Sequence, residues 1–231
     1  MSFNDRNRKN KLKILALHGY RQNAVKFLNE TKNFCEAFSQ WAEFVYITAP
    51  HQVVLVDNPD NLLMGEKLEK GQRGWFFNRR NKTNRGIRNG GPAIGFNDTV
   101  RVIEEVFRDA GPFDGILGFS QGACLAGILS NLQQSGLIKA KFNFAIIISG
   151  FMSKCLPHMK YFQEVINLPS LHVIGDNDQI IPNKMSQELS DCFENPLVVR
   201  HPGGHIIPDI SQELECYQYF IQKQHALKYF S

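Results

Sequence analysis

The residue with the clearest capacity for chemistry is Ser120, at the centre of the run Gly118-Phe119-Ser120-Gln121-Gly122. An apolar stretch precedes this run and another follows it, which predicts a strand that turns sharply into a helix at the serine. Such a turn forces its central residue into an unusual backbone conformation, and the flanking glycines leave room for it. The Ser120 hydroxyl would then stand at a helix N-terminus, which favours developing negative charge. We therefore expect a nucleophilic serine rather than an ordinary glycine-rich turn.

A serine nucleophile needs a base and a group that orients the base, and both residue types follow later in the chain. The predicted strand 168–175 is followed by two competing carboxylates, Asp176 and Asp178. Either would lie at the C-terminal end of a strand, where open α/β sheets place their sites. After another short strand, a glycine-rich stretch carries His205, and His201 is its local rival. We favour His205 as the base, because His201 stands at the strand end before a proline and has less freedom to reach Ser120.

The oxyanion formed during an attack by Ser120 needs hydrogen-bond donors, and backbone N–H groups of two segments are candidates. One donor is the N–H of Gln121, directly after the nucleophile. The other comes from the loop after the first predicted strand, where Tyr20 is the first choice and Arg21 the alternative. We expect His18, in the same loop, to be a structural hydrogen-bonding group and not a second base.

Seven motifs follow one another along the chain: LHGYRQN (17–23), RGWFF (73–77), GPFDG (111–115), GFSQG (118–122), LPSLH (168–172), GDND (175–178) and PGGH (202–205). In this order they resemble the motifs of the FSH-type serine hydrolases of the α/β-hydrolase superfamily. The resemblance implies a catalytic triad of Ser120, Asp178 and His205. It selects Asp178 over Asp176 because the acid of the family falls three residues after the strand-end glycine and four before a proline. The resemblance covers about residues 11–220.

Strand and helix signals alternate along the chain, which predicts an α/β fold with a mostly parallel central sheet and helices on both faces. We expect one domain over residues 12–231, the α/β-hydrolase fold that the resemblance implies, after a flexible tail at 1–11. Besides the strand–helix unit at Ser120, the expected strands cover 12–17, 44–47, 144–148, 168–175 and 197–201, and the expected helices cover 23–41, 95–109 and 212–223.

One long segment, from about 57 to 95, interrupts this alternation with polar, glycine-rich and basic sequence. A connection of this length is usually functional or disordered, and here we expect a lid or insertion that can overhang the site. Trp75, Phe76 and Phe77 lie in its middle. They either anchor the segment to the core or line a substrate pocket for an acyl chain, and these two roles are compatible. We therefore list the three as pocket candidates.

Composition supports an ordinary globular protein and excludes several functional classes. A net charge of +4 over 231 residues is too small to indicate nucleic-acid binding. The five cysteines have no metal-like spacing and indicate reduced thiols in a cytoplasmic protein, although nuclear presence is also compatible. We find no metal motif, no nucleotide-cofactor motif and no apolar run that could insert stably in a membrane. We expect no cofactor, and the sequence leaves the oligomeric state open.

These residues together predict a carboxylesterase-type serine hydrolase that acts through an acyl-enzyme on a small-molecule ester. The resemblance and the aromatic segment favour medium-to-long alkyl or acyl chains. The first alternative is a thioesterase or acyl-protein hydrolase, since the same triad cleaves thioesters. The second is a ligand-binding protein that has the fold but no catalysis.

Overall fold

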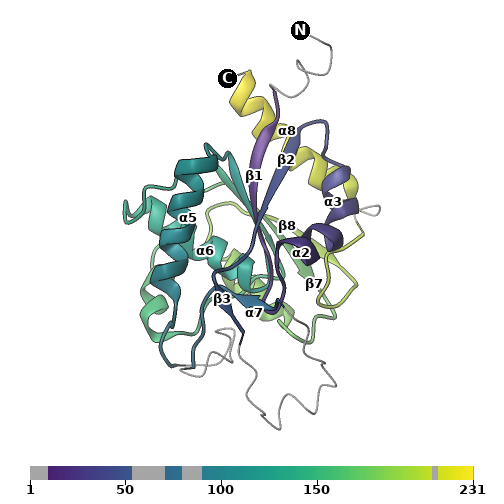
Figure 1. Cartoon of the computed structure of the whole chain (residues 1–231). Helices are drawn as coiled ribbons and strands as arrows, with labels where there is room; N and C mark the ends of the chain where they lie inside the picture. The colour runs from purple at the N-terminus through teal and green to yellow at the C-terminus, as the bar shows by residue number, and fades with distance from the viewer. Residues whose placement is uncertain (1–9, 54–70, 80–89, 210–212, 231) are drawn as a thin grey trace.

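The computed structural model describes residues 10–53, 71–79, 90–209 and 213–230. Its centre is a six-stranded sheet in the order β2-β1-β5-β6-β7-β8, and every neighbouring pair is parallel (Figure 1). The strands are β1 (Leu12–Leu17), β2 (Ala42–Ile47), β5 (Gly115–Phe119), β6 (Phe144–Ile148), β7 (Ser170–Gly175) and β8 (Leu197–His201). The structure confirms the predicted mostly parallel α/β fold.

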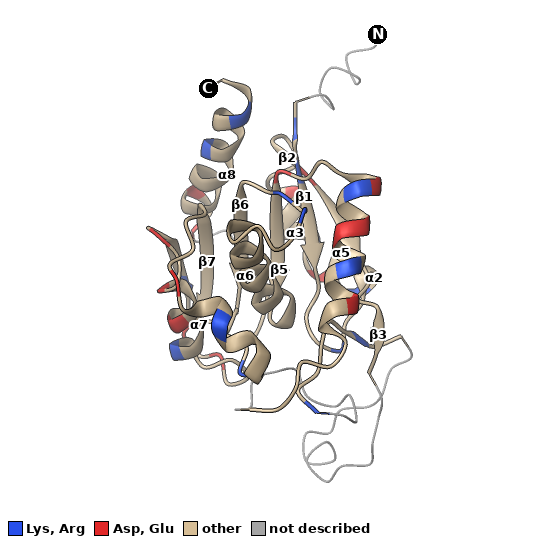
Figure 2. Cartoon of the chain, turned by 90° about the vertical axis from the view of Figure 1, so that its left-hand side faces the viewer, with Lys and Arg blue, Asp and Glu red and all other residues tan. Residues whose placement is uncertain are grey.

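Helices cover both faces of this sheet, as the alternating sequence predicts. Strands β5, β6 and β7 are buried at every position, which is the pattern of a parallel sheet covered on both sides. Figure 2 shows one layer of helices in front of the sheet, with the charged residues coloured mainly on the outer helices and loops. The helices are α2 (Ala24–Glu30), α3 (Lys32–Glu36), α5 (Phe96–Ala110), α6 (Gln121–Gln134), α7 (Asn183–Ser190) and α8 (Leu214–Tyr229), with a 3₁₀ helix η1 (Leu156–Phe162).

Two apolar cores, one on each face of the sheet, stabilise this arrangement. Alternate residues of a strand contribute to opposite cores, as the side-chain period of two requires. In β1, for example, Leu15 and Leu17 join the core beneath α5, α6 and α7, whereas Ile14 and Ala16 join the core beneath α2, α3 and α8. Helix α6 is buried from Gln121 to Gln133, so the strand–helix unit that carries Ser120 lies at the centre of the molecule.

The structure corrects the predicted single helix over 23–41. The chain forms two short helices, α2 and α3, with Thr31 between them in a non-helical conformation (φ −94°, ψ 1°). The Thr31 hydroxyl donates to the carbonyl of Phe27 at 2.7 Å and contacts the hydroxyl of Tyr46 at 2.7 Å. A side chain that hydrogen-bonds the preceding turn competes with regular helix geometry, which accounts for the break.

Two further differences concern short or terminal elements. Two-residue strands β3 (His51–Gln52) and β4 (Arg73–Gly74) form a small antiparallel sheet that the sequence does not reveal. Helix α8 extends to Tyr229, beyond the predicted end at residue 223. Among the described residues, no helix is both long and apolar enough to cross a membrane.

Candidate active site

Ser120 occupies the sharp turn between β5 and α6. Its backbone has φ 54° and ψ −113°, a conformation that non-glycine residues rarely adopt. Its N–H donates to the carbonyl of Ile148 at 2.9 Å, which fixes the turn against β6. A Cβ on Gly118 would lie 2.4 Å from the carbonyl oxygen of Gly122, and a Cβ on Gly122 would lie 2.1 Å from that of Leu17. Both glycines are therefore required, because β1, β5 and α6 approach one another too closely for a side chain.

Asp178 and His205 are in direct hydrogen-bond contact at the C-terminal edge of the sheet. The Asp178 Oδ2 atom lies 2.7 Å from His205 Nδ1. The other carboxylate oxygen accepts hydrogen bonds from the N–H groups of Ile180 and Ile181, both at 2.8 Å. Burial by itself raises the pKa of the Asp178 carboxyl, but these hydrogen bonds outweigh burial and hold the pKa below its ordinary value. An ionised carboxylate here fixes the proton on Nδ1 and leaves Nε2 as an acceptor.

The two residues that compete with Asp178 and His205 have other partners. Asp176 is about half exposed and pairs with the Arg200 guanidinium at 2.7 Å. His201 is the last residue of β8, and its Nδ1 accepts from the N–H of Gly203 at 3.2 Å. The structure therefore brings together the carboxylate that the family resemblance selects and the histidine that loop position favours.

The histidine loop packs directly on the serine turn. The ring of His205 lies 4.8 Å from that of Phe119, the residue before Ser120. A Cβ on Gly175 would meet the carbonyl oxygen of Gly204 at 2.5 Å, so the loop also lies against the end of β7. Ser120, Asp178 and His205 thus come from three segments that meet at the C-terminal edge of the sheet.

The loop after β1 reaches the same place. A Cβ on Gly19 would lie 3.4 Å from the Cβ of Ser120, so the two segments are in contact. His18 is fully buried: its Nε2 accepts from the N–H of Ala49 at 3.0 Å, and its Nδ1 lies 2.7 Å from the Gly19 carbonyl oxygen. Burial lowers the pKa of His18 to about 4, so the ring is neutral and structural, as expected.

The segment 71–79 clarifies the roles of the three aromatic candidates. Trp75, Phe76 and Phe77 have no exposed surface. Their burial supports the expectation that they anchor this segment to the body of the protein, and their role in a substrate pocket stays a prediction. Most of the predicted lid at 57–95 lies outside the described residues.

The Gln121 side chain is a part of the site that sequence reasoning missed. Its Oε1 accepts from the N–H of Trp75 at 2.9 Å, and its Nε2 donates to the carbonyl of Phe76 at 2.6 Å. The sequence signal that could have indicated this role is the polar amide of Gln121 at the start of α6, which is otherwise mostly apolar. Its partners stand more than forty residues earlier in the chain, so no local pattern could name them.

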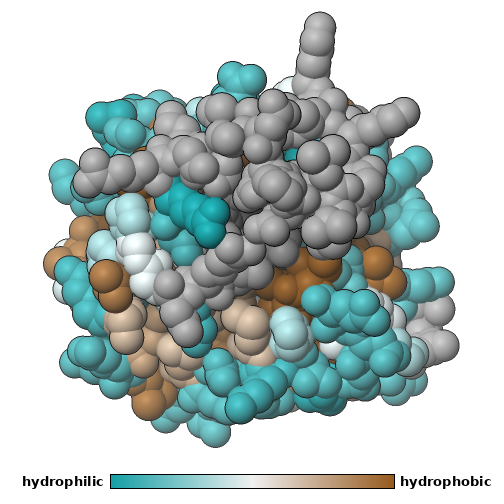
Figure 3. All heavy atoms as spheres, turned by 90° about the horizontal axis from the view of Figure 1, so that it is seen from below, coloured by the Kyte–Doolittle hydropathy of each residue, from teal (hydrophilic) through white to brown (hydrophobic). Residues whose placement is uncertain are grey.

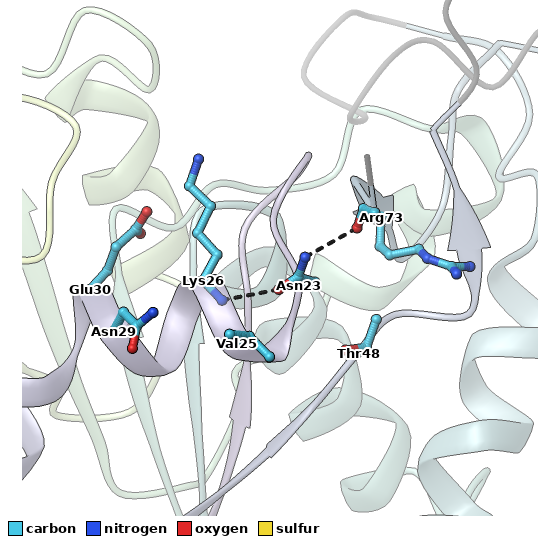
Figure 4. A pocket seen from close by; sticks show the side chains of 8 residues that line it. Asn23, Val25, Lys26, Asn29, Glu30, Thr48 and Arg73 are labelled. Carbon is cyan, nitrogen blue, oxygen red and sulfur yellow. Dashed lines mark hydrogen bonds between the residues drawn. The ribbon is translucent and has the colours of Figure 1, made fainter. Parts of the chain in front are cut away.

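An open groove of about 570 Å³ lies beside the loop that follows β1 (Figure 4). The Asn23 side chain caps α2 by accepting from the N–H of Lys26 at 3.0 Å, and it donates to the carbonyl of Gly71 at 3.3 Å. The groove contains none of the candidate catalytic residues. Its lining residues are Asn23, Val25, Lys26, Asn29, Glu30, Thr48, Gly71 and Arg73.

In the part of the chain that the structure describes, no group of three or more histidine, cysteine, aspartate or glutamate side chains could hold a metal ion.

With this geometry established, comparison with known proteins decides the family. The profile of the family described as "Serine hydrolase (FSH1)" matches residues 7–217. The chain belongs to the FSH1 serine hydrolase family. The FSH1 relatives include "Esterase AGAP003155" of Anopheles gambiae, 40% identical over 93% of this chain and 78% of that protein. They also include "Esterase OVCA2" of Danio rerio, 37% identical over 92% of this chain and 97% of that protein. The motifs also indicate a resemblance to the ovarian-cancer-associated gene 2 esterase, the name under which this relative is known.

The similarity of this FSH1 hydrolase to solved structures concerns the fold alone. A carboxylesterase of Bacillus cereus aligns with a TM-score of 0.59 at 19% identity, over 93% of this chain and 89% of that chain. Acyl-protein thioesterase 2 of Zea mays aligns with a TM-score of 0.58 at 16% identity, over 94% of each chain. The six-stranded parallel sheet is thus that of the α/β-hydrolases.

Proposed function

We propose that this protein is a carboxylesterase-type serine hydrolase with Ser120 as nucleophile, His205 as base and Asp178 as the orienting acid. The contact of 2.7 Å between Asp178 and His205, next to the serine turn, carries the proposal. The names of the curated relatives support the activity class, since they are esterases.

In the proposed reaction, Ser120 attacks the carbonyl carbon of the ester while Nε2 of His205 takes its proton. His205 then gives the proton to the departing alcohol, which leaves an acyl-enzyme on Ser120. Water attacks the acyl group in a second half-reaction with His205 again as base, and the carboxylic acid departs. Asp178 keeps the proton on Nδ1 and stabilises the imidazolium in each half-reaction.

We assign the oxyanion donors to the backbone N–H groups of Gln121 and Tyr20. Gln121 is the first residue of α6, so its N–H also benefits from the helix N-terminus. The alternative donor, Arg21, already donates its N–H to the carbonyl of Arg73 at 2.9 Å, which favours Tyr20.

We further propose a preference for medium-to-long acyl chains. Figure 3 shows brown apolar surface on the face of the molecule where the strands end. Ile206, next to His205, is half exposed, and Leu156 and Met159 of η1 are exposed after the end of β6. Each methylene buried on such a surface adds about 0.8 kcal/mol, which would raise kcat/KM along a series of p-nitrophenyl esters. Equal values across the series would contradict this preference.

Thioesters are a second candidate substrate class, because the same triad cleaves them and the fold is shared with acyl-protein thioesterase 2 of Zea mays. An ester and a thioester with the same acyl chain separate the two classes by their kcat/KM. We also propose a reducing compartment for the protein, the cytoplasm, since all five cysteines are free thiols.

A fluorophosphonate probe tests the catalytic proposal directly. An active serine hydrolase is modified at Ser120, which mass spectrometry of the tryptic peptide can locate, and a binding protein without catalysis is not. The matched control is Ser120→Ala, which should lose labelling and lose about 10⁴-fold or more in kcat while staying folded. Unlabelled wild-type protein, or a folded Ser120→Ala variant with normal turnover, would overturn the mechanism.

A further inference from the structure

We infer that the segment 73–77 links the two proposed oxyanion donors, the backbone N–H groups of Gln121 and Tyr20. The Gln121 side chain and Trp75 are the positioning residues that set the distance between these two donors. This inference deepens the proposed function and rests on it. The two proposed donors belong to separate segments: Tyr20 to the loop after β1, and Gln121 to the start of α6. Contacts between these segments must therefore fix the distance between the two donors.

The first link joins the segment to the nucleophile turn. Both polar ends of the Gln121 amide are occupied, one by the N–H of Trp75 at 2.9 Å and one by the carbonyl of Phe76 at 2.6 Å. The side chain is fully buried. A buried amide bound at both ends cannot rotate without leaving two backbone groups unsatisfied. The backbone of Gln121, which carries the proposed donor, is therefore held by its own side chain.

The second link joins the same segment to the loop after β1. The indole N–H of Trp75 donates to the carbonyl of His18 at 2.7 Å, and the two rings lie 4.9 Å apart. The Trp75 carbonyl accepts from the Thr99 hydroxyl at 2.5 Å, which fixes the tryptophan from the side of α5. His18 stands two positions before Tyr20, so Trp75 holds the base of the donor loop.

Backbone pairing strengthens the second link. The N–H of Arg21 donates to the carbonyl of Arg73 at 2.9 Å, and the N–H of Arg73 donates to the carbonyl of Gln22 at 3.0 Å. The contact between Asn23 and the Gly71 carbonyl continues this pairing at the edge of the groove (Figure 4). One end of the segment, at Arg73, thus pairs with the loop after β1 as neighbouring strands do. The other end, at Trp75 and Phe76, hydrogen-bonds the Gln121 side chain next to Ser120.

An oxyanion hole accelerates a reaction only if its donors are placed before the charge develops. If one donor is displaced relative to the other, the hydrogen bonds to the transition-state oxyanion weaken more than those to the substrate. The reason is that the neutral ester carbonyl of the substrate depends less on these two donors. Loss of a link should therefore lower kcat and leave KM close to its wild-type value.

Gln121→Met tests the link, because methionine has a similar shape and removes both hydrogen bonds. The chain offers a matched control in the same helix: Gln133 also holds a backbone by both ends, with Oε1 accepting from the N–H of Phe142 at 3.0 Å and Nε2 donating to its carbonyl at 3.1 Å. Gln133→Met removes the same pair of bonds at the far end of α6. We expect Gln121→Met to lower kcat by about 10- to 100-fold with little change in KM, and Gln133→Met to keep wild-type kcat.

A second measurement separates positioning from stability. The affinity of an alkyl trifluoromethyl ketone, whose adduct with Ser120 carries an oxyanion, should fall in Gln121→Met by the same factor as kcat. If Gln121→Met does not fold, Trp75→Phe removes the indole N–H together with part of the buried ring, and it should show the same pattern, with a loss of about tenfold. The test variant is Gln121→Met or, if that does not fold, Trp75→Phe. If the folded test variant has the same kcat and the same inhibitor affinity as Gln133→Met, this inference is wrong, while the proposed function is unaffected. A wild-type protein that hydrolyses no ester and is not labelled at Ser120 would overturn it together with the proposed function.

Discussion

At the scale of single residues, Asp176 and Asp178 show how position after β7 determines chemistry. Both follow the same strand, two residues apart. The side chain of Asp178 is almost fully buried and accepts three hydrogen bonds, whereas that of Asp176 is 45% exposed and pairs with Arg200. Only the buried carboxylate can hold an imidazole in one tautomer, because solvent does not compete for its oxygens.

We therefore expect Asp178→Asn to be far more damaging than Asp176→Asn. An amide at the orienting position favours the wrong tautomer of His205, with a loss of about 10⁴ in kcat. The matched change at Asp176 removes an exposed ion pair, which contributes little. Kinetics of both purified variants on one ester check the ranking. Equal losses, or the reverse order, would show that Asp178 is not the catalytic acid.

At the scale of elements, the close approach of α6 to β1 sets the position of Ser120, the proposed nucleophile. A Cβ at Gly122 would lie 2.1 Å from the Leu17 carbonyl oxygen and 2.7 Å from that of His18, and backbone atoms cannot move aside. At Gly127, in the same helix, a Cβ would meet the Leu189 side chain at 3.1 Å, and that side chain can adjust.

Gly122→Ala should therefore push α6 away from β1, which lowers the melting temperature and abolishes esterase activity. Gly127→Ala is the control: alanine gains about 1 kcal/mol of helix propensity over glycine, which offsets the small shift of Leu189. Thermal unfolding and fluorophosphonate labelling of the two variants make the comparison. A Gly122→Ala variant as stable and as active as Gly127→Ala would contradict the close approach.

The same elements show what the sequence could predict. The serine turn and the buried strands can be predicted from the sequence because each depends on a local pattern, whereas the choice of Asp178 over Asp176 depends on the family resemblance. The two-residue pairing of β3 with β4 was not readable, because two residues carry no periodicity. The sequence does not decide whether Trp75 is buried in a core or lines a pocket, because aromatic residues serve both equally well. The Gln121 link joins residues 46 positions apart, and a distant partner leaves no mark in the local sequence.

At the scale of the whole molecule, three buried histidines make folding sensitive to acid. Burial lowers the pKa of His18 and of His158 to about 4, and that of His172 to about 3, from an ordinary value of 6.5. The unfolded chain therefore binds more protons than the folded chain between about pH 6.5 and 4, so stability rises with pH through this window. Acidification from pH 6.5 should cost about 1.4 kcal/mol per pH unit for each such histidine.

His172 offers the cleanest test of this dependence, because it lies inside β7, away from the candidate catalytic residues, and its Nδ1 has no hydrogen-bond partner. Leucine at this position keeps an apolar side chain between the same neighbours and cannot take up a proton. At pH 8 the difference in unfolding free energy between His172→Leu and wild type reports the changed packing and the loss of the hydrogen bond between His172 Nε2 and Ser170 Oγ (3.2 Å). At pH 5 the free energy of unfolding of the variant, measured relative to wild type, should be about 2 kcal/mol larger than at pH 8. The reason is that the folded wild type must keep the His172 ring neutral. Carboxylates titrate alike in both proteins and cancel. Urea unfolding at the two pH values measures the gain, and an unchanged difference would show that His172 is not held neutral by the fold.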